Sequence, residues 1–215
     1  MNGEHGPRLR LAPDRTVGVA RHSVPMTATA ISWNRVLTDQ LVFHWQYQLR
    51  PRLEGLTDAE YLWEPVPGSW NVRPRLRDEQ PGRGPFTIDW AYPAPDPPPV
   101  TTIAWRIAHI VVGVFATRTA SHFGGPEACY DTWPYPGTAA EALDQFDTAY
   151  AGWLAGVRGL GEEGLARPCG PAEGPFAESP LADLVTHIHR EVIHHGAEIA
   201  LLRDLWAHGQ TTRSA

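Results

Sequence analysis

The sequence has 215 residues, and its 18 basic and 24 acidic side chains give a formal net charge of −6. This length predicts one domain with a full core, and the acidic balance, without any Lys/Arg-rich run, argues against a broad nucleic-acid footprint. No stretch approaches about 18 uninterrupted apolar residues, so we expect no membrane span. Cys129 and Cys169 match no metal or redox spacing, and the N-terminus lacks a secretory pattern, so we expect free thiols and a cytoplasmic location.

Residues 1–30 mix Arg, Pro, Gly and polar residues without periodicity, which predicts a disordered N-terminal extension and leaves Met26 open as the biological start. The first helix is expected over residues 31–54. Its apolar residues recur at helical spacing: Trp33, Leu37, Leu41, Trp45 and Leu49. His44 lies on one edge of this stripe. It is either a histidine at the border of the core or a group that lines a pocket, and the pattern does not decide.

A long connection follows, over residues 55–99. Ten of the 21 prolines lie between Pro65 and Pro99, so little regular structure is expected there. A connection of this length in a compact domain is usually functional or a lid. Its segment WEPVPGSWNVRPR, residues 63–75, is either packed down by its two tryptophans or binds a ligand directly.

Three more amphipathic helices are expected, over residues 101–123, 139–157 and 179–206. In the last, Ser179 is the expected N-cap and Pro180 the first helical residue. The resulting fold class is all-α: a four-helix bundle with a long Pro-rich loop between helices 1 and 2 and no convincing strand pattern. The bundle domain is expected to span residues 31–207, with a flexible tail over 208–215.

The second helix carries His109 away from its apolar face. The residues nearest to His109 on the helix surface are all small: Thr102, Gly113, Ala116 and Ala120. Such a strip leaves room beside the imidazole for a closely packed helix or for a bound ligand. Gly113 inside a helix costs about 1 kcal/mol relative to Ala, so we expect a packing or access reason for it.

The last helix contains the strongest chemical signal. Helical rotation places His195 in the middle of the apolar stripe and Glu191 one turn before it, at the edge. Polar groups aimed into a helix interface are costly unless they are paired, and a divalent metal would satisfy both side chains, with His109 from the facing helix as third ligand. A buried Glu–His hydrogen bond without metal is the alternative. His187 and His194 flank the stripe, whereas His189 points away and is expected to be solvated.

A resemblance narrows these alternatives. The segments REVIHHGAEIALLRDLW, LTDAEYLWEPVPGSWNVRPR and TIAWRIAHI resemble the DinB-like superfamily, which includes mycothiol-dependent maleylpyruvate isomerase and bacterial thiol S-transferases. The resemblance covers roughly residues 33–206. It implies a four-helix bundle in which His109, Glu191 and His195 hold a divalent metal. The family often has HRGQI where this chain has HGAEI, so Gly196 and Ala197 replace the usual Arg-Gly.

The resemblance also implies a chemistry. Zinc is the expected metal, with nickel, iron or manganese also compatible with a glutamate ligand. A low-molecular-weight thiol such as mycothiol would ionise at the metal and attack a small electrophile, in S-transfer or thiol-assisted isomerisation. His187, His194 and His44 are the candidates for proton transfer or pocket lining. A metal-dependent hydrolase and a non-catalytic metal-binding bundle remain alternatives. The expected partners are the small-molecule thiol and its substrate, with no nucleic acid or membrane, and a homodimer is left open.

Overall fold

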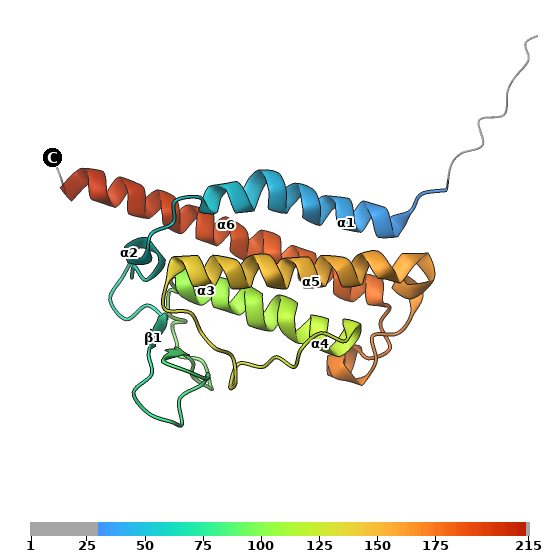
Figure 1. Cartoon of the computed structure of the whole chain (residues 1–215), viewed down its shortest axis with the longest axis horizontal. Helices are drawn as coiled ribbons and strands as arrows, with labels where there is room; N and C mark the ends of the chain where they lie inside the picture. Colours follow the sequence, from blue (N-terminus) through green and yellow to red (C-terminus); the bar gives the residue numbers. More distant parts are fainter. Residues whose placement is uncertain (1–29, 214–215) are drawn as a thin grey trace, which may run out of the picture. The chain divides into compact units, whose positions relative to one another are not determined.

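A computed structural model describes residues 30–213, and this part of the chain is mostly helical (Figure 1). Residues 31–215 form one compact unit. The expected N-terminal extension, up to residue 29, and the alternative start at Met26 lie outside the described residues. Toward the other end, the last helix continues to Arg213, through most of the segment expected to be a flexible tail.

The first long helical segment changes its hydrogen-bond pattern along its length. It begins as α1 (Trp33–Phe43), where the Ser32 side chain accepts a hydrogen bond from the backbone N–H of Arg35. It continues as the π-helical segment η1 (His44–Leu49) and ends in the 3₁₀ turn η2 (Arg50–Leu53), which contains Pro51. Together these elements cover nearly the expected range.

The second helical segment also contains a π-helical stretch. It runs as α3 (Ile103–His109), η3 (Ile110–Ala116) and α4 (Thr117–Phe123), capped at its start by Thr102. It ends at Gly124, whose φ of 69° is the left-handed conformation that favours glycine after a helix. The π-helical stretch begins directly after His109, and such widened turns are frequent at functional sites.

The other two long helices extend further than their sequence patterns predicted. α5 runs over Ala139–Ala166 with a kink at Gly161, and α6 over Leu181–Arg213. Between them lies the short 3₁₀ element η4 (Pro171–Phe176). α6 begins one residue after Pro180, so its expected start is shifted by one position.

The Pro-rich connection contains more regular structure than expected. It includes the helical turn α2 (Asp58–Tyr61) and an antiparallel pair of strands, β1 (Val72–Pro74) and β2 (Phe86–Ile88), in which Val72 faces Ile88. The expectation of no strand was therefore wrong. Strands of three residues are too short to show the alternation by which a strand is recognised in a sequence.

The long helices pack around a shared core. α5 contacts α1 and η3, and α6 contacts α5, α3, η3 and η1 (Figure 1). Among the largest fully buried side chains are Trp153, Phe146 and Phe115. Because α6 has neighbours on several sides, His189 is buried, with its ring 6.3 Å from that of Trp153. The expectation that His189 is solvated was wrong, and burial lowers the pKa of this histidine to about 4.

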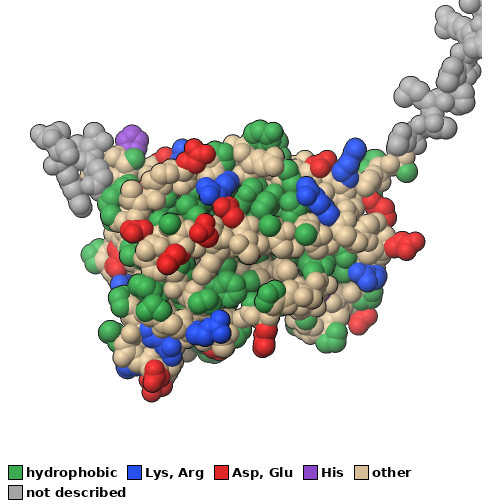
Figure 2. All heavy atoms as spheres, in the orientation of Figure 1, with side chains coloured by type: hydrophobic (Ala, Val, Ile, Leu, Met, Phe, Trp, Pro, Cys, Tyr) green, Lys and Arg blue, Asp and Glu red, His purple; other side chains and the backbone are tan. Residues whose placement is uncertain are grey.

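Figure 2 shows acidic, basic and hydrophobic side chains interspersed on one face of the molecule. Several exposed large hydrophobic side chains belong to the first helical segment: Trp33, Val36, Phe43 and Tyr47. In the part of the chain that the structure describes, no helix combines the length and the apolar character needed to cross a bilayer.

Candidate metal centre

Three side chains from two packed helices meet on one point. His109 ends α3, and Glu191 and His195 lie one turn apart on α6. One potential ligand atom from each of the three lies within 4.8 Å of the others. The Nε2 of His195 is 3.4 Å from Oε2 of Glu191. Two ligands at ~2.0–2.2 Å from a tetrahedral cation are roughly 3.3–3.6 Å apart, so this pair already has the required separation.

A carboxylate orients the ring of His195. Its Nδ1 donates a hydrogen bond to Oε2 of Glu198 at 2.6 Å, and Nη1 of Arg106 lies 3.0 Å from the same oxygen. With its proton on Nδ1, the ring carries its lone pair on Nε2, on the side of Glu191. The positive guanidinium from α3 balances the carboxylate, so Glu198 is not an unpaired charge at a half-buried position.

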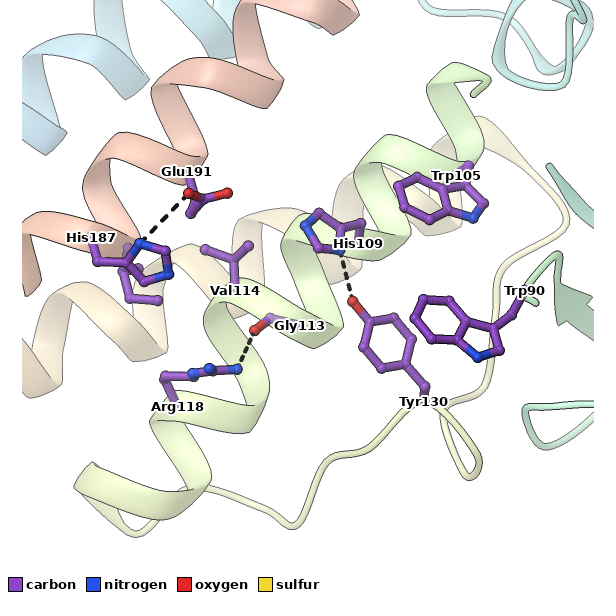
Figure 3. A pocket seen from close by; sticks show the side chains of 10 residues that line it. Trp90, Trp105, His109, Gly113, Val114, Arg118, Tyr130, His187 and Glu191 are labelled. Carbon is purple, nitrogen blue, oxygen red and sulfur yellow. Dashed lines mark hydrogen bonds and ion pairs between the residues drawn. The ribbon is translucent and has the colours of Figure 1, made fainter. Parts of the chain in front are cut away.

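A phenol orients the ring of His109. Its Nδ1 is 2.7 Å from the hydroxyl of Tyr130, which leaves the other ring nitrogen on the side of Glu191 (Figure 3). Burial raises the pKa of Tyr130 to about 12, so the phenol stays neutral near pH 7. Burial, together with the nearby His195 and Arg106, lowers the pKa of His109 to about 4. The imidazole is thus neutral near pH 7, as a metal ligand must be.

Gly113 makes the contact with Tyr130 possible. A Cβ at this position would lie 2.1 Å from the Tyr130 hydroxyl oxygen, which is far inside van der Waals contact. The small strip beside His109 is therefore filled, at this point, by an aromatic side chain from the connection between α4 and α5. This explains why a glycine is tolerated inside the helix despite its cost.

The described residues contain a second group with metal-ligand spacing: His194, His195 and Glu198. In this group Nδ1 of His195 lies only 2.6 Å from Oε2 of Glu198, at hydrogen-bond distance and closer than two ligands of one tetrahedral cation. The side chain of His194 is 64% exposed and its Nε2 lies 3.6 Å from Glu198. We therefore interpret His194 and Glu198 as part of the surroundings of His195, which Glu198 orients. Only the His109–Glu191–His195 group is considered as a metal centre.

A cavity of about 350 Å³ opens beside two of the three side chains (Figure 3). His109 and Glu191 lie in its wall. One side is aromatic, because Trp105 stacks on His109 at 5.3 Å and Trp90 stacks on Tyr130 at 6.2 Å between ring centres. Arg118 from α4 and His187 from α6 complete the polar part of the wall. A ligand in this cavity would contact both the metal-binding groups and a flat apolar surface.

Comparison with known proteins gives the family. The model of the DinB superfamily matches residues 40–199, which include all three side chains of the candidate site. The chain belongs to the DinB superfamily. No curated protein and no solved structure matches the sequence. Proteins of this superfamily often bind metal, and the described residues contain His/Glu groups that could hold an ion.

The other three candidate histidines, His187, His194 and His44, lie in three different environments. His187 lines the cavity, where its Nδ1 lies 3.6 Å from Oε1 of Glu191 and 2.7 Å from a guanidinium nitrogen of Arg190. His194 is at the surface. His44 is buried on η1, where Nδ1 is 3.0 Å from the side-chain oxygen of Gln48, and it is not in the cavity wall.

The glycine that departs from the family pattern has a packing role. A Cβ at Gly196 would lie 3.1 Å from Leu49 and 3.2 Å from Nε2 of His44, so a larger residue would require these two side chains to shift. Arg106 from α3 brings a guanidinium nitrogen to 3.0 Å from Nδ1 of His195.

Sequence reasoning missed most of the cavity wall. Trp90 belongs to the Pro-rich connection, and Tyr130 to the connection after α4. Neither follows a helical or strand period from which its position could be predicted. The segment 63–75 contributes indirectly: Trp70 packs 6.3 Å from Trp90 and 5.8 Å from Trp105, ring centre to ring centre. The one signal in the sequence for Tyr130 was Gly113, which indicated an approaching partner without naming it.

Proposed function

We propose that this protein is a metal-dependent S-transferase or thiol-assisted isomerase, built on a four-helix bundle and using a low-molecular-weight thiol and a small electrophile. One observation carries the proposal: two imidazoles and one carboxylate converge on one point, and two of the three, His109 and Glu191, lie in the wall of a cavity. As three ligands they would leave a coordination position open toward that cavity. Closed structural sites use four protein ligands instead. His109, Glu191 and His195 would hold the cation, with zinc the first choice.

The bound cation would supply one thing, a lower pKa for a thiol that enters the cavity. The protein's own residues do the rest. Glu198 and Tyr130 fix the two imidazoles by their Nδ1 atoms, so that each presents a lone pair. Trp105 and Trp90 offer a flat apolar surface to an unsaturated substrate. His187, whose side chain is 44% exposed, passes the thiol proton to bulk water.

The two reactions share their first bond. In S-transfer, the thiol sulfur bonds to an electrophilic carbon, a leaving group departs with the bonding electron pair, and the thiol proton goes to solvent through His187. In isomerisation, sulfur adds to a C=C bond conjugated to a carbonyl, the resulting single bond rotates, and sulfur leaves again. No oxidant or reductant is needed in either case.

The test uses untagged protein loaded with zinc, a panel of mycothiol, bacillithiol and glutathione, and monobromobimane as a generic electrophile. We expect conjugation above the rate without protein for at least one thiol, abolished by chelation and in His195→Ala. His194→Ala, an exposed neighbour, is the matched control and should keep the rate. Conjugation that does not exceed the uncatalysed rate for any thiol, or that persists after chelation, would overturn the proposal.

A further inference from the structure

A second cavity adjoins the one at the candidate metal centre. It has a volume of about 530 Å³, and Arg118 and His187 line both cavities. The two spaces therefore meet at these side chains. The first cavity alone has room for the reacting part of a thiol and for its substrate, and the second extends the available volume away from the metal-binding groups.

One side of helix α6 lines both cavities. Glu191, His187 and Asp183 follow one another at four-residue intervals, so they lie on one side of the helix. Glu191 lines the first cavity, His187 both, and Asp183 the second. Eight residues of helix correspond to a rise of about 12 Å, which is the reach that a ligand would need from the metal centre to the far cavity.

A fixed polar network forms the wall where the cavities meet. Arg118 donates to the carbonyl oxygen of Gly113 at 2.8 Å, and its other terminal nitrogen lies 3.5 Å from Glu173. The carboxylate of Glu173 is also 2.9 Å from His122, and the side chains of His122 and Glu173 are 6% and 9% exposed. The Nε of Arg118 has no hydrogen-bond partner among the described residues, so this N–H donor at the junction has no acceptor there.

The charges of the second cavity cancel. Its wall contains two guanidinium groups, from Arg118 and Arg190, and two carboxylates, from Glu173 and Asp183. The hydroxyl of Ser179 adds a further polar group, and Phe176 an exposed ring. Such a wall offers donors and acceptors in similar measure, which suits hydroxyl and amide groups better than a cluster of negative charge.

We propose that the second cavity binds the tail of the thiol: a polar tail without net charge, rich in hydroxyl and amide groups. The sulfur-bearing head occupies the first cavity. This inference rests on the proposed function and adds to it where the tail lies and what its charge is. It also assigns a role in tail binding to Arg118 and Asp183, which the sequence patterns did not single out.

The test measures binding to full-length, untagged protein loaded with cobalt(II), whose near-ultraviolet absorption reports a sulfur ligand without any turnover. Three probes are titrated: mycothiol, whose tail is an uncharged pseudo-disaccharide; N-acetylcysteine methylamide, which has the head alone; and bacillithiol, whose malate tail is anionic. We expect mycothiol to bind at least about tenfold more tightly than the head fragment. The gain in affinity of bacillithiol over the head fragment should be smaller than that of mycothiol.

Filling the second cavity should remove that gain. In Asp183→Trp the tenfold advantage of mycothiol should vanish, while the head fragment and cobalt bind as before. Thr186→Trp, an exposed position on the same helix outside both cavity walls, is the matched control and should keep the advantage. Ser179→Trp is a second filling variant in case Asp183→Trp does not fold.

The outcomes separate the two proposals. A sulfur band with no advantage for mycothiol, or an advantage that survives both filling variants, overturns the tail site and leaves the proposed function standing. A larger gain for bacillithiol overturns the assignment of an uncharged tail. If no probe produces a sulfur band, the proposed function fails, and the tail site fails with it.

Discussion

The two imidazoles of the candidate centre are held in opposite ways. His195 is oriented by charged groups on the helices themselves, Glu198 three residues later on α6 and Arg106 on α3. His109 is oriented by a neutral phenol that arrives from a connection, Tyr130, and reaches it only because Gly113 has no side chain. One side of the site is therefore built by helical spacing and the other by the path of a loop. The two sides should respond differently to mutation.

The largest expected effect comes from removing a ligand. His195→Ala deletes one of three proposed ligands, and zinc affinity should fall by roughly a thousandfold, because one metal–imidazole bond and its oriented partner are lost together. Isothermal titration of untagged protein measures this. His194→Ala, next in the chain but exposed, should change the affinity by less than about threefold. Equal effects of the two variants would contradict the assignment of the centre.

Metal removal should lower thermal stability. A ligand present at 100 times its dissociation constant stabilises the folded state by ~2.7 kcal/mol, which corresponds to a rise in Tm of roughly 5–10 °C for a chain of this size. Scanning calorimetry with zinc, and again after chelation, should show this difference. At the same zinc concentration His109→Ala, which should bind zinc far more weakly, should show almost none. A shift of the same size in that variant would place the bound zinc elsewhere on the protein.

The charged side of the site should be more sensitive than the neutral side. Glu198→Ala leaves Nδ1 of His195 without its acceptor and Arg106 without its partner, and zinc affinity should fall by about 10–100-fold. Glu198→Gln keeps an acceptor oxygen at the same place and should recover most of that loss. If the glutamine variant is as weak as the alanine variant, the carboxylate acts through its charge and not by orienting the ring.

The neutral side should lose less. Tyr130→Phe removes one hydrogen bond between neutral groups, worth ~1 kcal/mol, so zinc affinity should fall by about fivefold. Gly113→Ala should reach a similar value, because its methyl group displaces the Tyr130 hydroxyl. The double variant should be no weaker than either single one, since both remove the same contact. Additive losses would show that Gly113 acts on something other than Tyr130.

These differences explain what could be read from the sequence. Glu191 and His195 were singled out because a helix fixes side chains four residues apart on one face, and His109 because it stood apart from an apolar stripe. Glu198 and Arg106 lie on helices too, but the sequence does not show which partner a charged residue on a half-exposed helix face contacts. Tyr130 follows no period, and its position depends on how a connection folds back over η3. Loop-borne parts of the site therefore needed the structure.

The fold shows the same division. The helical segments were predicted by their apolar period, and their ends shifted, as at Ala166 of α5 and at the start of α6. The two short strands of the connection were missed. His189 was misplaced because helical rotation describes one helix and does not show that α6 has packed neighbours on several sides.

The smallest expected effect concerns the burial of His189. The Nε2 of His189 has no hydrogen-bond partner among the described residues, so the ring carries an unmet polar atom in the core. His189→Met keeps a similar volume without that atom, and the free energy of unfolding should rise by ~0.5–1 kcal/mol. Chemical denaturation at neutral pH measures the change. A loss of more than about 1 kcal/mol would mean that the ring nitrogen is satisfied after all.

The central claim is that three side chains from two helices share one cation and leave it an open position. X-ray absorption of the untagged, zinc-loaded protein tests it most directly, because the outer-shell scattering counts imidazole ligands. The account predicts one zinc per chain with nitrogen and oxygen ligands only, two of them imidazoles, and one imidazole in His109→Ala. An unchanged imidazole count in that variant, or a sulfur ligand from the protein itself, would contradict it.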